Sequence, residues 1–404
     1  MDERGEVKIT FVIPYFYPAL QYGGTPRSAF ELARGLVQRG HSVQVLTTDS
    51  GGKTRLGETA HNHSRSVEGI QVHYYPNISN SLAYHHRLFW SPEFFRQIQE
   101  RLTEADVLHM HELRSATSIF ACRAALRSKV PYVISPHGGL RRLGKRLPKL
   151  VFDVLWGKRI LTKAEALIAL SPVEEHDAQA FGVQTHRIQR LPNAVNIQEY
   201  RDLPPREGFR SRWQIGSSKI VLFLGRLHWI KGADVLVRAF QKAHARQPDI
   251  HLVIAGPDDG QEPHLRRLVH AMRIKEAVTF TGFLNETEKR EALTGSDVVV
   301  LPSRSEAFAL SAIESLLCGT PVIMSSACGL YPSPGPEQGV IPFESENVDE
   351  LSHKIFMMAG PEPFRHNVAA ARNFVLQEFS ADAIAAKAES IYEAILQGQS
   401  RRFS

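Results

Sequence analysis

The chain has 404 residues, of which 43% are hydrophobic and 22% are charged, so it is long and apolar enough for two domains with full cores. The apolar run after the charged N-terminus is short and ends at Pro14, so we expect neither a signal peptide nor a transmembrane helix. Cys122, Cys318 and Cys328 show neither paired nor metal-ligand spacing, which favours a reducing, cytoplasmic compartment.

The positive charge is concentrated in the first half of the chain. Residues 1–200 carry 25 Lys and Arg against 18 Asp and Glu, whereas residues 201–404 carry 23 against 24. The excess lies between His137 and Lys163, where eight basic residues accompany one acid. No nucleic-acid recognition motif accompanies this patch, so it favours an anionic membrane surface or an anionic acceptor over nucleic acid.

The first units of the chain predict a nucleotide-binding arrangement. Residues 7–13 read as a strand, Gly23 and Gly24 precede a helix from about Pro26 to Gln38, and residues 43–47 read as a second strand. Strand, glycine loop, helix and strand form the mononucleotide-binding unit, although a pair of glycines is also a common turn. The loop lacks the G-x-G-x-x-G pattern, which disfavours a dinucleotide cofactor.

Histidines follow two of the next predicted strands. Residues 106–111 end in the alternating pair His109 and His111, which suggests a metal site, but no third ligand stands at a recognisable spacing and we expect no metal. Residues 130–135 read as a strand that delivers His137 to its carboxyl end. A histidine in such a glycine turn is also common as a plain surface residue.

Two segments of the first half combine aromatic or aliphatic residues with basic ones. Residues 81–95 read either as helices packed over the sheet edge or as an acceptor-facing or membrane-facing surface. The basic helix around Leu147 to Trp156 is shortened by Pro148 and Gly157, so it predicts an interfacial helix and not a spanning one.

A second set of strand and helix units begins at Lys219. The preceding residues 196–218 contain Pro204 and Pro205 and few large apolar residues, so they read as an interdomain linker. The strand at 220–224 leads to Arg226 and to Lys231 at a helix start. Exposed cations near a helix N-terminus are mildly unfavourable alone, but there they can neutralise a bound anion that the helix dipole already favours.

The most informative stretch runs from Leu301 to Val322. A buried-type strand at 298–301 enters a polar loop, and a helix follows from about Ser311 to Cys318, so an anion site is expected at the carboxyl end of a parallel strand. Glu306 and Glu314 bracket this site, and a carboxylate beside a phosphate requires hydroxyl donors such as those of a sugar or ribose. Alternatively, Ser311 and Glu314 form only a capping box.

The two glutamates, separated by seven residues and followed by Gly-Thr-Pro-Val at 319–322, resemble the signature of the family 4 retaining glycosyltransferases. The resemblance extends over nearly the whole chain. The sequence departs from the family pattern at Ala307 and Ala309, where glycine is usual, which puts the loop path and the donor sugar in question. It also has Asn193 to Asn196 as Asn-Ala-Val-Asn, where the family has Asn-Gly-Val-Asp.

The resemblance implies a role for each matching residue. Glu306 contacts the donor sugar, His137 lies beside the anomeric carbon, Arg226 and Lys231 hold the diphosphate, and Glu314 binds the ribose. These catalytic assignments are Glu306, His137, Arg226 and Lys231; the donor-binding set is Gly23, Gly24, Arg226, Lys231, Gly282, Phe283, Leu284, Phe308, Ala309, Leu310 and Glu314.

The resemblance also implies an α/β chain of the GT-B class, with two Rossmann-like domains facing across a cleft. We expect residues 1–195, with a C-terminal helix at about 384–404, on the acceptor side, and residues 219–383 on the donor side. No Asp-x-Asp motif is present, so we expect no obligatory metal and no cofactor beyond a UDP- or GDP-linked sugar as substrate.

The activity implied is retaining transfer of a hexosyl group to a hydroxyl acceptor. The acceptor expected is a saccharide or lipid-linked saccharide of polysaccharide or glycolipid synthesis, reached at the cytoplasmic face of a membrane. Since no third carboxylate is placed as a nucleophile, same-face substitution is favoured over a covalent intermediate. Two other classes remain open on this fold, a nucleotide-sugar epimerase and a non-catalytic nucleotide-sugar-binding protein.

Overall fold

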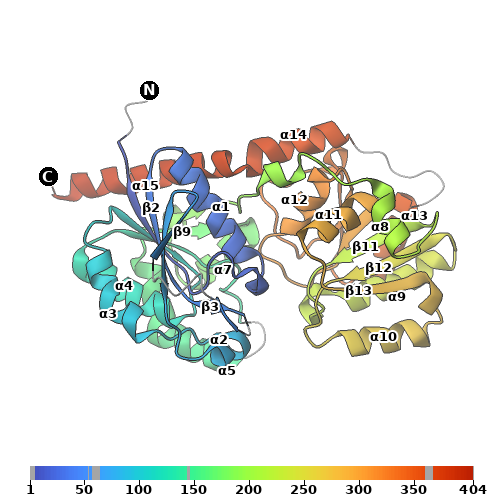
Figure 1. Ribbon diagram of the computed structural model, residues 1–404, viewed down its shortest axis with the longest axis horizontal. Coiled ribbons are helices and arrows are strands. Elements are labelled where there is room, and N and C mark those ends of the chain that lie inside the picture. The colour runs from blue at the N-terminus through green and yellow to red at the C-terminus, as the bar shows by residue number, and fades with distance from the viewer. Residues whose placement is uncertain (1–4, 53, 57–63, 143–145, 360–366, 404) are drawn as a thin grey trace. The chain divides into compact units, whose positions relative to one another are not determined.

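The computed structural model describes residues 5–52, 54–56, 64–142, 146–359 and 367–403. The chain divides into two compact units (Figure 1): unit 1 contains residues 1–195 and 379–404, and unit 2 contains residues 196–378. Each unit is built on its own parallel sheet, so the predicted α/β class with two Rossmann-like domains is confirmed.

The sheet of unit 1 has the strand order β10-β9-β8-β7-β1-β2-β6-β5. The edge strand β5 runs antiparallel to β6, and the other neighbouring pairs are parallel. The strands are β1 (Lys8–Val12), β2 (Ser42–Thr48), β5 (Ser64–Val67), β6 (Ile70–Tyr75), β7 (Val107–His111), β8 (Tyr132–Ser135), β9 (Ala166–Ala169) and β10 (Ile188–Arg190), beside a small ribbon of β3 (Ser50–Gly51) and β4 (Thr54–Arg55).

Helices cover both faces of this sheet because its strands are apolar on both sides. In β1, Phe11 packs in the cluster that contains Leu36 and Tyr392, whereas Val12 packs in the opposite cluster with Phe94. The helices of unit 1 are α1 (Gly24–Gln38), α2 (Asn80–His86), α3 (Pro92–Arg101), α4 (Ala116–Ser128), α5 (Arg146–Phe152), α6 (Lys158–Lys163), α7 (Pro172–Ala180) and α15 (Ala381–Phe403), with a π-helical turn at Asp153–Gly157 between α5 and α6.

The C-terminal helix α15 lies against α1 although the two are far apart in sequence. At Gly35 of α1, an added Cβ would lie 2.5 Å from the carbonyl oxygen of Ala381, so only glycine permits this approach. Arg39 at the end of α1 forms ion pairs with Asp382 at 2.9 Å and with Glu389 at 2.7 Å. These contacts attach the end of the chain to unit 1.

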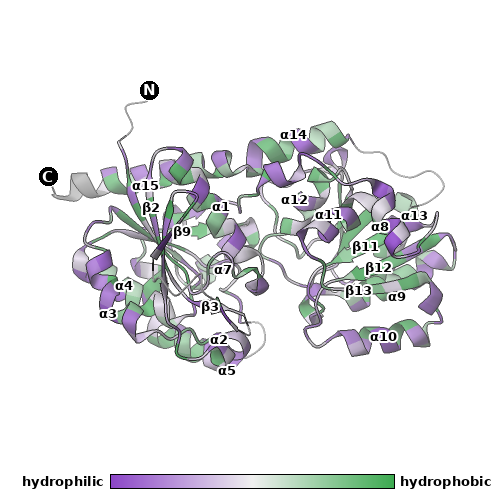
Figure 2. Cartoon of the chain, viewed as in Figure 1, coloured by the Kyte–Doolittle hydropathy of each residue, from purple (hydrophilic) through white to green (hydrophobic). Residues whose placement is uncertain are grey.

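The sheet of unit 2 is wholly parallel, in the order β13-β12-β11-β14-β15-β16, and its central strands are coloured as hydrophobic in Figure 2. Its strands are β11 (Lys219–Leu224), β12 (Ile250–Ala255), β13 (Val278–Gly282), β14 (Val298–Leu301), β15 (Val322–Ser325) and β16 (Val340–Phe343). Its helices are α8 (Arg206–Arg212), α9 (Ala233–His244), α10 (Glu262–Ala271), α11 (Glu286–Gly295), α12 (Leu310–Leu317), α13 (Val348–Ala359) and α14 (Val368–Phe379).

Residues 196–218, which we expected to form a linker, are folded into unit 2. Helix α8 packs on α11, and Phe209 is fully buried there. Arg210 donates to Asp297 at 2.7 Å and to the carbonyl of Gly295 at 3.1 Å. A few buried apolar side chains and several arginine ion pairs attach the segment, and its low overall apolar content concealed them.

No helix in the described part of the chain is both long enough and apolar enough to cross a bilayer.

Candidate active site

In unit 2 the predicted site residues gather at the carboxyl ends of β11 and β14. These strands are neighbours at the point where the strand order reverses, which is where open α/β sheets form a ligand crevice. The loop after β11 carries Arg226 and Lys231, and the loop after β14 carries Glu306. The topology therefore brings together residues about 75 positions apart in sequence.

Lys231 and Glu306 form the centre of this site. Nζ of Lys231 lies 2.5 Å from Oε1 of Glu306, and Oγ of Ser303 donates to Oε2 of Glu306 at 3.0 Å. The side chains of Lys231 and Glu306 are 23% and 15% exposed, so the pair is sheltered but reachable. A carboxylate paired with an ammonium group in this way can accept from a hydroxyl beside a bound anion.

Gly232 permits the close approach of the two loops. It adopts a left-handed conformation with φ 68° at the N-cap of α9. An added Cβ would lie 2.0 Å from the carbonyl oxygen of Pro302, in the loop after β14. Both the conformation and the contact require glycine, and they place Lys231 against Glu306.

Arg226 is held by an exposed ion pair. Its guanidinium lies 2.5 Å from Asp259, and both side chains are nearly half exposed, at 48% and 43%. An exposed pair of this kind contributes at most about 1 kcal/mol, so a phosphate can displace the carboxylate at little cost. The described structure therefore leaves Arg226 accessible to an anion.

The glutamate of the following helix is buried and paired with a lysine. Glu314 accepts a hydrogen bond at 2.8 Å from Lys289, which also pairs with Glu286 at 2.8 Å. Helix α12 starts at Leu310, and its N-cap Ala309 makes no side-chain capping bond. The capping-box interpretation of Ser311 and Glu314 is therefore wrong, because the helix begins one residue earlier and Glu314 lies beyond its first turn.

The loop before α12 tolerates alanine in place of glycine. Ala309 has φ −82°, and Ala307 is not among the residues with positive φ. The N–H of Ala309 donates to the carbonyl of Gly329 at 2.8 Å, while Phe308 is buried. The departure from the family pattern therefore requires no strained backbone at these positions.

The residues predicted to border the base of the donor lie at the end of strand β13 and directly after it. The carbonyl of Gly282 accepts from the N–H of Gly256 at 2.8 Å, which connects the end of β13 to the residue that follows β12. Phe283 follows with 72% of its side chain exposed, an unusual exposure for a phenylalanine. An exposed ring here can stack on a planar ligand.

In unit 1, His137 follows β8 and Gly23 precedes α1. His137 has φ 50°, and its Nε2 lies 2.9 Å from Nδ1 of His111, with the two rings stacked. Burial lowers the pKa of His137 to about 4, so the ring is neutral near pH 7. Gly23 has φ 102° and is the N-cap of α1, which leaves the first backbone N–H groups of that helix without a side-chain cap.

Glu174 is a functional candidate that sequence reasoning missed. Its buried carboxylate accepts from the N–H of Gly138 at 2.5 Å and from the N–H of Leu170 at 3.0 Å, and so it fixes the turn that presents His137. Burial raises the pKa of Glu174 to about 7. The sequence signal that could have identified Glu174 is an acid in the first turn of helix α7, which follows strand β9.

The His-x-His pair makes a contact that the sequence does not reveal. His109 and His111 lie in β7, and within the described residues no group of three or more His, Cys, Asp or Glu is arranged to hold a metal ion. His111 instead contacts His137 directly.

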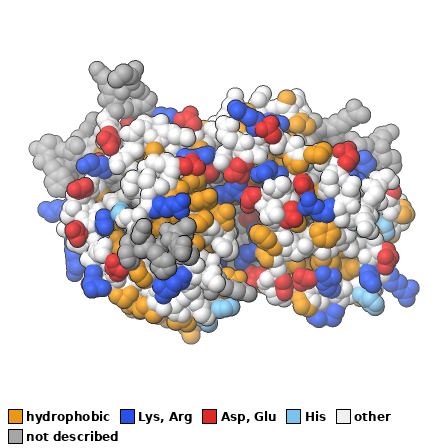
Figure 3. Space-filling model, viewed as in Figure 1, with side chains coloured by type: hydrophobic (Ala, Val, Ile, Leu, Met, Phe, Trp, Pro, Cys, Tyr) orange, Lys and Arg blue, Asp and Glu red, His pale blue; other side chains and the backbone are white. Residues whose placement is uncertain are grey.

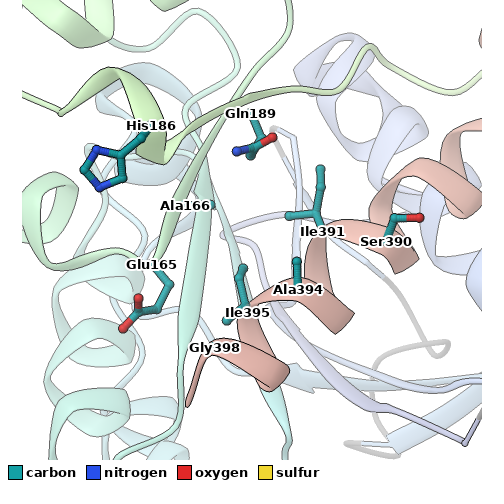
Figure 4. Close-up of a pocket in the computed structure, with 9 residues that line it drawn as sticks. All are labelled: Glu165, Ala166, His186, Gln189, Ser390, Ile391, Ala394, Ile395 and Gly398. Carbon is teal, nitrogen blue, oxygen red and sulfur yellow. The ribbon is translucent and has the colours of Figure 1, made fainter. Parts of the chain in front are cut away.

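A hollow of about 400 Å³ lies in the sheet of unit 1, at the end opposite to the one that carries His137 (Figure 4). It is bordered by the amino-terminal ends of β9 and β10 and by α15, and none of the predicted site residues lines it. Its lining residues are Glu165, Ala166, His186, Gln189, Ser390, Ile391, Ala394, Ile395 and Gly398. Arg226, Lys231 and Glu306 do not line this hollow, so we do not place the active site there.

Two family models match the chain. Residues 22–199 match the model described as Glycosyltransferase Family 4, and residues 206–372 match the model described as Glycosyl transferases group 1.

Two curated relatives are similar along most of their length. The uncharacterized glycosyltransferase MJ1607 of Methanocaldococcus jannaschii is 26% identical, with 96% of this chain and 99% of the relative aligned. Mannosylfructose-phosphate synthase of Agrobacterium fabrum is 24% identical, over 86% of this chain and 80% of the relative.

Solved structures show the same fold at low identity. Anabaena Alr3699/HepE in complex with UDP-glucose is 18% identical, with TM-score 0.73 and coverage of 96% of this chain and 100% of that one. Sucrose-phosphate synthase from Thermosynechococcus elongatus is 20% identical, with TM-score 0.74 and coverage of 97% and 100%.

Proposed function

Because the chain belongs to glycosyltransferase family 4 and has the GT-B fold, we propose that it is a retaining hexosyltransferase that uses a nucleotide diphosphate sugar. The observation that carries this proposal is the contact between Lys231 and Glu306 at the switch point of the unit 2 sheet. It combines a cation for a diphosphate with a carboxylate for a sugar hydroxyl. The Anabaena structure, which contains UDP-glucose, supports a UDP-linked donor.

In the proposed reaction, the bond between the anomeric carbon and the diphosphate oxygen breaks, and the acceptor oxygen bonds to that carbon from the same face. The acceptor hydroxyl proton passes to an oxygen of the leaving diphosphate, so no protein nucleophile is needed. Arg226 and Lys231 stabilise the negative charge that develops on the leaving group. Glu306 accepts from a hydroxyl of the donor sugar and orients the ring.

The test is a screen of UDP- and GDP-linked sugars without an acceptor. A transferase hydrolyses its own donor slowly, so release of the nucleoside diphosphate from one donor identifies it. An epimerase would yield a new sugar nucleotide or free sugar without net transfer to any acceptor added later. Binding of a donor without turnover would overturn the enzymatic proposal in favour of a sensor.

Removing either cation should weaken binding of the nucleoside diphosphate about 10- to 150-fold, since each charge-assisted contact contributes roughly 1.5–3 kcal/mol. Calorimetry on Arg226→Ala and Lys231→Ala measures the loss. Arg266→Ala is a matched control, because Arg266 pairs with Glu262 on the surface of α10 and is 56% exposed. If both site variants bound as tightly as the control, the two cations would be structural.

We further propose that the acceptor is a lipid-linked saccharide met at the cytoplasmic face of a membrane. The support is an exposed apolar helix face, which we call the α5 face, in residues 146–157. Its only acid, Asp153, is buried and pairs with Arg114 and Arg142, each at 2.8 Å. Asp153 therefore faces the interior, and the apolar side chains of the segment face outward. These side chains, exposed by 41% to 72%, are Leu147, Leu150, Val151, Val154, Leu155 and Trp156.

Basic residues flank the α5 face, since Arg146, Lys158 and Arg159 are exposed. Hydrophobic side chains also gather along the lower edge of unit 1 in Figure 3, where Figure 1 labels α2 and α5. Apolar side chains beside cations match an anionic bilayer interface. Residues 143–145, part of the basic segment predicted from sequence, lie outside the described residues.

Binding to vesicles tests the α5 face. We expect salt-sensitive co-sedimentation with anionic vesicles and about tenfold weaker binding for a Leu147→Asp, Val154→Asp double variant. Leu376→Asp is the control, because Leu376 is a 43% exposed leucine on α14 of unit 2. Equal binding of the double variant and the control would refute the role of the α5 face. Equal binding of the wild-type protein to neutral and anionic vesicles would rule out the electrostatic part, and no binding to either would favour a soluble acceptor instead.

A further inference from the structure

Two neighbouring histidines in unit 1 each have one buried nitrogen without a hydrogen-bond partner among the described residues. These atoms are Nε2 of His111 and Nδ1 of His137, and the other nitrogens of the two rings face each other at 2.9 Å. Buried polar groups in folded proteins are normally paired, so an unpaired nitrogen beside a candidate site needs an explanation.

The stacked ring of His109 holds the ring of His111 in place. Both nitrogens of His109 are satisfied, by the hydroxyl of Tyr392 at 2.7 Å and by Oγ of Ser135 at 2.7 Å. The ring of His109 stacks on that of His111 with centroids 4.2 Å apart, and Phe11 packs against both. The ring of His111 is therefore held rigidly, and among the described residues its side chain has one polar contact, the one to His137.

Protons on the pair can be arranged in two ways. Burial lowers the pKa of both rings, so each carries one N–H, and a single proton lies between Nδ1 of His111 and Nε2 of His137. If His111 donates, its unpaired Nε2 is a bare lone pair and His137 carries its proton on Nδ1. If His137 donates, the unpaired N–H is on Nε2 of His111.

The arrangement in which His111 donates to His137 has the lower free energy. Unpaired N–H groups in protein interiors are rarer than under-satisfied acceptors, so the unpaired donor belongs where a ligand can reach it. The two unpaired nitrogens are themselves both buried, but His137 as a residue is half-buried next to the exposed Gly138, whereas His111 as a residue is only 1% exposed. A hollow of about 20 Å³ lined by Ser28, His111, His137 and Asn193 has room for one hydroxyl-sized group. Oγ of Ser28 is likewise without a partner among the described residues.

We propose that His111 is a positioning residue whose Nδ1–H donates to Nε2 of His137, holding His137 as the Nδ1–H tautomer that donates to an oxygen atom in this hollow. The oxygen belongs to a substrate hydroxyl or to a water molecule. Only the choice between these two rests on the proposed function; the tautomer does not.

The tautomer can be read directly by ¹⁵N NMR on the full chain with labelled histidine. We expect His137 to show a protonated Nδ1 and an unprotonated Nε2 in the wild-type protein. A wild-type spectrum with the proton on Nε2 of His137 would overturn the proposal without any variant. Spectra with and without each nucleotide sugar of the donor screen separate the two oxygen sources, since only a substrate hydroxyl shifts Nδ1 when it binds.

Two substitutions test the role of His111. In His111→Asn the amide nitrogen can replace Nδ1 as donor, so His137 should keep the Nδ1–H tautomer and turnover should stay within about threefold of wild type. In His111→Leu the donor is lost, and we expect mixed tautomers and a turnover lowered at least about tenfold, with the Michaelis constant little changed. An unchanged tautomer in His111→Leu would overturn the proposal.

His353→Asn, on helix α13 of unit 2, is the control for the general effect of removing an exposed histidine outside unit 1. The readout of the tautomer needs no turnover, so a failed donor screen and a failed tautomer assignment are distinguishable results.

Discussion

Glu306→Gln should lower the rate of sugar transfer about 30- to 1,000-fold, which corresponds to about 2–4 kcal/mol in activation free energy. Glutamine keeps the size of the side chain and can still accept from Ser303, but it removes the anion that pairs with Lys231 at 2.5 Å. Binding of the nucleoside diphosphate should stay nearly unchanged, because that ligand lacks the sugar. Steady-state transfer and calorimetry measure the two quantities.

The contrast with Glu314→Gln makes this prediction specific. Glu314 pairs with Lys289 on α11, so its substitution should weaken binding of the nucleoside diphosphate itself if it holds the ribose. One variant then spares diphosphate binding and the other does not. Glu262→Gln, in a surface ion pair with Arg266, is the control for loss of a carboxylate in unit 2. Full affinity and full turnover in both site variants would refute the assignment of the two glutamates.

Gly232→Ala should destabilise unit 2 by about 2–4 kcal/mol and abolish the contact between Lys231 and Glu306. The alanine would have to keep φ 68° and would place its Cβ 2.0 Å from the carbonyl oxygen of Pro302. Because that oxygen is backbone, it can move only if the loop after β14 moves with it. Urea unfolding measures the loss of stability, and donor binding by calorimetry measures the displacement of the loop.

Gly216→Ala is a matched control for the conformational part of this effect. Gly216 has nearly the same φ, 65°, but an added Cβ there would meet no atom within 4 Å. We expect a loss of about 1 kcal/mol, the cost of a left-handed alanine alone. If the two substitutions cost the same, the contact with Pro302 would be easily relieved and the close approach of the loops would not depend on glycine.

The order of elements and the fold class could be predicted from the sequence because those signals are local. Short apolar runs followed by turn residues and periodic helices recur along both halves, and they correspond to strands such as β11 and β14. The spacing of Glu306 and Glu314 likewise lies within a single loop and helix, so it could be recognised without any coordinates. Helix α8 escaped prediction because Phe209 is its one buried apolar ring and its other contacts to unit 2 are made by arginines, which carry no apolar period.

The sequence by itself determined which residue types stand at the strand ends, whereas the partners of those residues were decided only by the tertiary structure. Lys231 meets Glu306 across 75 residues, and Glu174 accepts from Gly138 across 36. Neither pairing has a local signature, because each depends on which strands become neighbours and on one close backbone approach. The His-x-His motif shows the difference most clearly: its spacing suggested a metal site for which the sequence offered no third ligand, and only the structure shows that His111 contacts His137 and that the three rings stack.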